Sequence, residues 1–179
     1  MTEALGLTPS QTAGPYLSIG LLRDLVPTVL VEPGDPRAIR IRGRLVDGAG
    51  DGVGDGMVEI WQADEAGRYG TAAFPGFGRA GTDADGRFEF ATLKPGRVAW
   101  PAGGLQAPHV AVGILARGLL KRVVTRLYFP DEVEANEADP VLTALSPSRR
   151  ETLVAVPEDG GLLFDIRLQG PAQTTFFAV

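Results

Sequence analysis

Alternating apolar and polar residues predict a series of short β-strands along the chain. The clearest spans residues 39–46, where Ile39, Ile41 and Leu45 face one side and three arginines face the other. One face of this strand therefore belongs to the core, and the other lies in water or at an interface. The run at 109–115 is almost continuously apolar, which is typical of a strand buried on both faces. Further strands are expected at residues 58–63, 87–90, 122–129, 149–156 and 162–168.

Segments rich in glycine, proline and aspartate separate these strands and predict turns and loops. Residues 1–20 are expected to form an irregular N-terminal arm, residues 17–31 a loop or short helical turn, and residues 71–81 a long loop. Residues 131–145 predict a short helix interrupted by Pro140. Short strands with little helix favour an all-β fold, an antiparallel β-sandwich with long loops and one or two short helices. Residues 1–179 are long enough to form it as a single domain.

Two glycine-rich segments have alternative interpretations. Residues 47–56 contain five glycines and three aspartates, as a phosphate-binding loop could, but no Gly-Lys-Ser/Thr ending and no helix pattern follow. A flexible connection is favoured there. Residues 83–86 begin like a calcium-binding loop, yet the later ligands of such a loop are not set out. Their aspartates and glycine therefore favour a turn.

Composition removes several classes of function. The net charge is -5, and the arginines are dispersed rather than clustered, so no nucleic-acid or anionic-membrane footprint is visible. The chain has no cysteine, which excludes disulfides, zinc–thiolate sites, iron–sulfur clusters and thiol nucleophiles. The N-terminus lacks the basic and apolar regions of a signal peptide, and no apolar run is long enough to span a bilayer. A cytoplasmic location is expected.

The candidate metal ligands are few. Tyr69 follows the strand at 58–63 across a polar turn, and His109 is the one histidine in the chain, so a site that needs two imidazoles is impossible. On ligand count alone, a packed tyrosine with its hydroxyl paired and a hydrogen-bonded core histidine are favoured over metal ligands.

A series of segments, in chain order, resembles the intradiol aromatic-ring dioxygenases. The match runs from about residue 8 to the C-terminus. Within that family, the segments most resemble the alpha-type subunits of the branch that cleaves protocatechuate. That family has a β-sandwich fold, which agrees with the strand pattern. The matching segments are TPSQTAGPY (8–16), VEIWQAD (58–64) with GRY (67–69), KPG (94–96), APH (107–109), LARG (115–118), TRLYF (125–129), RRETL (149–153) and FDIRLQG (164–170).

The resemblance implies that this chain carries a vestigial metal site. Catalytic chains of the family hold non-haem Fe(III) with two tyrosines and two histidines, a donor set that suits a hard trivalent ion. Tyr69 and His109 match the first ligand of each kind, whereas the second tyrosine falls at Val98 and the second histidine at Ala111. Neither Val98 nor Ala111 can bind iron. The resemblance therefore implies that this chain has no catalytic residue and no metal ligand, and that a homologous beta subunit binds the Fe(III).

The resemblance also implies that this chain lines the substrate pocket, through Thr12, Gly14, Pro15, Tyr16 and Arg117. A Gly-Pro pair can wall a planar ring closely, and an arginine can pair with the protocatechuate carboxylate. Without the resemblance, an ordinary turn and a solvated charge would explain these residues.

The implied reaction is cleavage of protocatechuate by O2 to 3-carboxy-cis,cis-muconate, in a larger assembly of alpha–beta protomers. The alternatives are a metal-free β-sandwich binding module, disfavoured by the intact arm, and a self-sufficient homodimeric dioxygenase, disfavoured by Val98 and Ala111.

Overall fold

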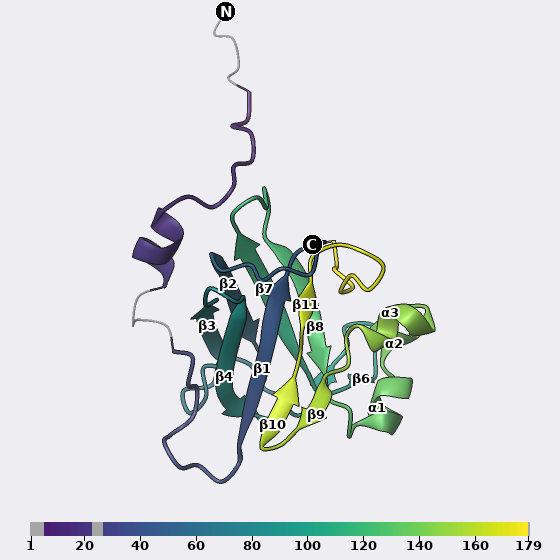
Figure 1. Ribbon diagram of the computed structural model, residues 1–179. Coiled ribbons are helices and arrows are strands. Elements are labelled where there is room, and N and C mark those ends of the chain that lie inside the picture. Colours follow the sequence, from purple (N-terminus) through teal and green to yellow (C-terminus); the bar gives the residue numbers. More distant parts are fainter. Residues whose placement is uncertain (1–5, 23–26, 179) are drawn as a thin grey trace, which may run out of the picture.

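Two β-sheets pack face to face in the computed structural model, which describes residues 6–22 and 27–178 (Figure 1). The core between them is formed by the inward-facing apolar residues of both sheets. Ile41, Leu45 and Phe90 come from the first sheet, and Val58 and Ile114 come from the second. The alternation that predicted these strands therefore separates core from surface, and the all-β sandwich is confirmed.

The first sheet is built around β1 (Ala38–Val46), which runs antiparallel to β4 (Arg87–Leu93). The last strands of the chain, β10 (Gly161–Leu163) and β11 (Ile166–Arg167), both pair parallel to β1, and β9 (Val156–Glu158) pairs antiparallel with β10. This sheet is therefore mixed, whereas the sequence predicted antiparallel pairing throughout. Alternation fixes which residues face inward but not the direction of the neighbouring strand.

The second sheet is antiparallel throughout. Its strand order is β3-β2-β7-β8. A small separate hairpin, β5 (Val98–Ala99) with β6 (Leu105–Gln106), precedes β7. The strands of the sheet are β2 (Gly56–Trp61), β3 (Phe77–Gly81), β7 (His109–Ala116) and β8 (Val123–Tyr128).

Short helices account for two differences between the predicted and the observed secondary structure. The predicted strand at 149–156 is wrong: most of it forms α3 (Pro147–Glu151) and the turn after it. Pro147 at the first helical position and two arginines in the last turn favour that helix. The predicted helix at 131–145 is two helices, α1 (Val133–Glu137) and α2 (Pro140–Thr143), since Pro140 begins the second and Asp139 caps it.

The predicted loop at 71–81 ends in a strand, because β3 occupies its last five residues despite two glycines. The predicted strand at 162–168 is divided between β10 and β11, with Phe164 and Asp165 between them.

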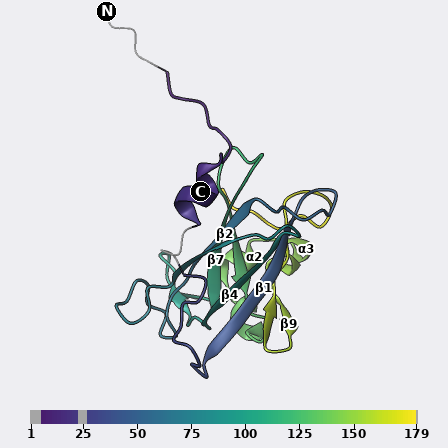
Figure 2. The ribbon, with the colours of Figure 1, turned by 60° about the vertical axis from the view of Figure 1, so that its left-hand side comes forward.

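The N-terminal segment projects from one end of the sandwich (Figures 1 and 2). Residues 6–14 have no regular secondary structure, and a π-helix, η1 (Leu17–Leu21), follows them. The irregular arm and the short helical turn predicted here agree with this, although residues 1–5 and 23–26 lie outside the described residues. Across the described ranges, no helix is long and apolar enough to cross a membrane.

Candidate functional site

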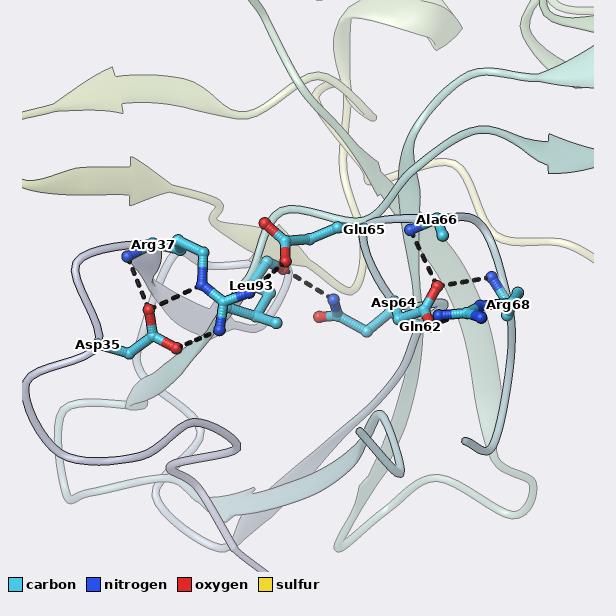
Figure 3. Close-up of polar contacts among 8 residues, drawn as sticks. All are labelled: Asp35, Arg37, Gln62, Asp64, Glu65, Ala66, Arg68 and Leu93. Carbon is cyan, nitrogen blue, oxygen red and sulfur yellow. Dashed lines mark hydrogen bonds and ion pairs between the residues drawn. The ribbon is translucent and has the colours of Figure 1, made fainter. Parts of the chain in front are cut away.

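The turn after β2 positions Tyr69 through the carboxylate of Asp64. Asp64 Oδ1 accepts hydrogen bonds from the backbone N–H groups of Ala66 and Arg68, each at 2.9 Å, and the Arg68 guanidinium pairs with Oδ2 (Figure 3). Gly67 has φ +76°, and a Cβ there would lie 2.1 Å from the Arg97 carbonyl oxygen, so glycine alone fits this turn. The Tyr69 ring then stacks on Trp61, with ring centroids 5.6 Å apart. Tyr69 is thus fixed by packing at 37% exposure.

His109, at the start of β7, is held as a neutral core histidine. It is 3% exposed, and Nδ1–H donates to the Ala107 carbonyl oxygen at 2.8 Å. Burial, followed by the positive charge of Arg126, lowers the pKa of His109 below its ordinary value. Its ring also contacts that of Tyr128, with centroids 5.6 Å apart. These contacts fit the satisfied core histidine expected from the sequence.

Arg126 supplies a fixed positive charge among the remaining polar groups of this region. It lies opposite Ala111 in the β7–β8 register and donates to Gln106 Oε1 at 2.8 Å and to the Tyr128 hydroxyl at 3.2 Å. Burial raises the pKa of Tyr69, and the charge of Arg126 opposes that rise. Sequence alternation had marked Arg126 only as a polar strand residue, because the residue opposite it is set by a register that alternation does not reveal.

These residues do not fit a ferric ion. Of the four metal positions that the resemblance implies, Tyr69, Val98, His109 and Ala111, two have side chains without a donor atom. One phenol and one imidazole are too few protein ligands for a trivalent ion. A guanidinium near Tyr69 and His109 further disfavours a trivalent cation there. In the part of the chain that the structure describes, no group of three or more His, Cys, Asp or Glu residues could hold a metal ion.

The arm is attached to the far end of β7. The Thr12 hydroxyl oxygen accepts a hydrogen bond from the Gly118 N–H at 2.7 Å and lies 3.5 Å from the Ala116 carbonyl oxygen. Gly118 has φ +94°, a conformation that glycine adopts without strain and that follows directly on Arg117. Two segments that are distant in the sequence, residues 12–18 and 116–118, are therefore brought together.

A cavity of about 390 Å³ lies between the arm and the body of the sandwich. We call it the arm cavity. Its size is within the range of small-molecule sites. Three predicted substrate residues, Gly14, Pro15 and Arg117, line it, and Thr12 stands beside it through its bond to Gly118. Tyr16 is not among the described lining residues and is 80% exposed. The other lining residues are Ala13, Leu17, Ser18, Leu22, Gly54, Asp55, Gly56 and Thr82.

Asp55 is the charged partner of Arg117 in the arm cavity. Its Oδ2 lies 2.8 Å from Arg117 Nε. Asp55 belongs to the glycine-rich segment at 47–56, for which the sequence predicted only a flexible connection. Its aspartates were visible in the sequence, but nothing there indicated that one of them reaches a residue after β7.

The arm cavity and the family metal positions lie at opposite ends of β7. His109 begins this strand and Ala116 ends it immediately before Arg117. At the usual rise of a strand, that separation is roughly 23 Å. Residues of the arm cavity therefore cannot share one small ligand with Tyr69 and His109 of the same chain.

Comparison with known proteins places the chain in a family. Residues 24–170 match the dioxygenase family. The chain is 42% identical to a protocatechuate 3,4-dioxygenase alpha chain of Burkholderia cepacia, over 96% of this chain and 97% of the relative. It is 43% identical to the Pseudomonas putida alpha chain, over 98% of each. It is also 33% identical to a Burkholderia cepacia beta chain of protocatechuate 3,4-dioxygenase, over 78% of this chain and 68% of that relative.

A solved structure agrees with this assignment. The dioxygenase domain of a dioxygenase and carbohydrate-binding protein fusion from Streptomyces sp. SirexAA-E superposes with a TM-score of 0.63. It is 27% identical and covers 94% of this chain and 99% of its own. Identity over nearly the whole length, together with the shared fold, shows that this chain belongs to the intradiol dioxygenase family.

Proposed function

We propose that this chain is the alpha-type subunit of a two-chain protocatechuate 3,4-dioxygenase. In this proposal a homologous beta-type chain holds Fe(III), and this chain completes the substrate pocket. Two alpha chains of such enzymes match this chain over almost all of their length. A beta chain matches this chain at lower identity and over less of its length. The mismatch of Val98 and Ala111 to the family ligands supports the alpha rather than the beta assignment.

The observation that carries the proposal is the distance between the arm cavity and the family metal positions. Gly14, Pro15 and Arg117 gather at one end of β7, whereas Tyr69 and His109 lie at the other. A catechol bound at a metal can reach the arm cavity only if the metal belongs to another chain. The projecting arm suits this arrangement, because it extends beyond the body of the sandwich (Figure 2).

The residues of this chain would bind and orient the substrate. The Gly14–Pro15 backbone offers a rigid wall for the aromatic ring, and the Arg117 guanidinium offers charge-assisted hydrogen bonds to the carboxylate. Ring opening between the two hydroxyl-bearing carbons, to give 3-carboxy-cis,cis-muconate, would use the ferric ion of the partner chain to activate the bound catecholate. Thr12 would hold the arm against Gly118, so that this wall stays in place.

Metal analysis of the separate and combined chains tests the proposal. The chain is produced alone, and also together with a homologous chain that carries both tyrosines and both histidines. We expect the lone chain to be colourless and free of iron, and the complex to be red and to cleave protocatechuate with uptake of O2. The partner produced alone is the control for activity that needs no alpha-type chain. Stoichiometric iron with a tyrosinate-to-iron absorption band in the lone chain would refute the proposal and favour a self-sufficient enzyme.

A further inference from the structure

The Arg117 side chain is already paired with a carboxylate before any substrate is present. Asp55 Oδ2 lies 2.8 Å from Arg117 Nε, and both residues line the arm cavity beside Gly14 and Pro15. Asp55 is also the one acidic residue among the described residues that line this cavity. A carboxylate that enters the cavity therefore meets a cation that Asp55 has partly neutralised.

The loop that carries Asp55 is anchored on both sides of the aspartate. Thr82 Oγ1–H donates to the Val53 carbonyl oxygen at 2.6 Å, and the same hydroxyl oxygen accepts from the Gly56 N–H at 2.9 Å. The Thr82 N–H in turn donates to the Gly56 carbonyl oxygen at 3.0 Å. The backbone around residue 55 is thus fixed against the end of β3, which keeps the Asp55 carboxylate within reach of Arg117 while its side-chain torsions stay free to rotate.

The ion pair is open enough to exchange its carboxylate. The Arg117 side chain is 78% exposed and that of Asp55 is 45% exposed, so separating them returns both groups to water and not to an apolar interior. An exposed pair of this kind is weak. A substrate carboxylate that reaches both edges of the guanidinium in a bidentate arrangement competes well against the single contact with Asp55.

We propose that Asp55 is a specificity-determining residue that exchanges with the substrate carboxylate for Arg117. When the cavity is empty, the Asp55 carboxylate pairs with the Arg117 guanidinium. When a carboxylated catechol enters, the catechol carboxylate pairs with the guanidinium instead, and the Asp55 side chain turns to solvent. A catechol without a carboxylate leaves the Asp55–Arg117 pair intact. The inference rests on the proposed function for its substrate.

Steady-state kinetics of the two-chain complex tests the exchange. Asp55→Asn keeps the size of the side chain and an acceptor for Arg117 but removes the competing charge. We expect it to lower KM for protocatechuate by about two- to five-fold, the range set by a weak exposed ion pair, and to leave KM for catechol unchanged. Asp51→Asn is the matched control, since it removes the same charge from the same loop outside the arm cavity.

The expected pattern is completed by Arg117→Ala, which should raise KM for protocatechuate far more than for catechol. In the Asp55→Asn, Arg117→Ala double variant, the decrease in KM for protocatechuate that Asp55→Asn causes should vanish. If Arg117→Ala acts selectively but Asp55→Asn leaves KM for protocatechuate unchanged or raises it, the exchange is overturned and the proposed function stands.

A second measurement is independent of iron and of catalysis. Benzoate is titrated into the lone chain, and the Nε–H signal of Arg117 is followed by NMR. We expect that signal to shift at lower benzoate concentration in Asp55→Asn than in the parent chain or in Asp51→Asn. If it does so while the two-chain complex shows no ring cleavage, the exchange is supported and the proposed function fails. Identical titrations in all three proteins would overturn the exchange.

Discussion

At the scale of single residues, burial and a neighbouring charge control the protonation of His109. Burial, the largest cause, and the positive charge of Arg126 oppose protonation of His109, and they outweigh the hydrogen bond to the Ala107 carbonyl and the charge of Asp139. The pKa of His109 is therefore lower in the folded than in the unfolded chain. The unfolded state takes up a proton first as the pH falls. Stability from neutral His109 is complete above its ordinary pKa of 6.5 and is lost as the pH falls through the folded value.

Replacing His109 tests directly whether this residue makes stability depend on pH, because the chain has no other histidine. We expect the melting temperature of the parent chain to fall between about pH 7.5 and about pH 5.5. His109→Asn keeps an amide donor near the Ala107 carbonyl but cannot titrate, so its melting temperature should change less over the same interval. Equal slopes for the two proteins would show that His109 is not the titrating group.

Gln62 is a buried polar residue whose hydrogen-bond partners lie inside the protein. It is 0% exposed, its Nε2 donates to the Leu93 carbonyl oxygen at 2.8 Å, and its Oε1 accepts from the Thr92 hydroxyl at 2.9 Å (Figure 3 shows the bond to Leu93). We expect Gln62→Leu to lower the free energy of unfolding by about 1–3 kcal/mol, because two buried groups lose their partners.

The Gln62 prediction is checked by urea denaturation with a double-mutant cycle. Thr92→Val removes the hydroxyl that Gln62→Leu leaves unpaired, so the double variant should lose less than the sum of the two single losses. Strict additivity would show that the bond between the two side chains contributes nothing.

At the scale of elements, β1 organises the first sheet because a glycine allows another backbone to approach it. A Cβ at Gly43 would lie 1.9 Å from the Phe164 carbonyl oxygen and 2.7 Å from the Phe88 ring. Phe164 stands between β10 and β11, where the chain leaves one pairing with β1 and begins the next. A glycine in a strand interior often marks such a close approach.

Gly43→Ala is therefore predicted to destabilise the protein by about 1–3 kcal/mol, since backbone atoms must move. Thermal or urea denaturation measures this loss. Gly20→Ala is the matched control, because a Cβ at Gly20 meets nothing within 4 Å and φ there is not positive. If the two variants prove equally stable, the approach of Phe164 does not restrict residue 43.

The elements also show what the sequence could and could not predict. Period-two alternation placed β1, β2, β4 and β8, and a nearly continuous apolar run placed β7, because one or both faces of each strand are buried. It failed for β3, where glycines carry no face preference, and at 149–156, where Ser146 and Pro147 begin a helix. The parallel pairing of β10 and β11 with β1 and the pairing of Asp55 with Arg117 join distant segments. Local patterns contain no information about such contacts.

At the scale of the whole molecule, the N-terminal arm is a segment that the rest of the described chain leaves mostly exposed. Leu7 and Tyr16 are exposed, and the hydrogen bonds of Thr12 hold the arm to β7 and to Gly118. Residues 1–179 as one domain, with residues 1–20 as its arm, stay a prediction. In the proposed complex, the arm gives the substrate ring its wall, and Arg117 binds the carboxylate.

Removing residues 1–16 should separate these two contributions. We expect the truncated chain, in complex with the beta-type partner, to show a raised KM for both protocatechuate and catechol, because both rings lose the Gly14–Pro15 wall. The melting temperature of the lone chain should change little, since residues 6–16 are mostly exposed. A KM that rises for protocatechuate alone would place the arm at the carboxylate instead of the ring.

The parallel pairing of β1 with β10 and β11 has a consequence for biosynthesis. Arg40 pairs with Gly161 and Leu45 pairs with Ile166, so β1 is synthesised long before the strands that pair with this edge. Until the ribosome releases residues 161–167, one edge of β1 stays unpaired and able to join other strands. Nascent chains that end before residue 161 therefore expose this edge and need protection from aggregation.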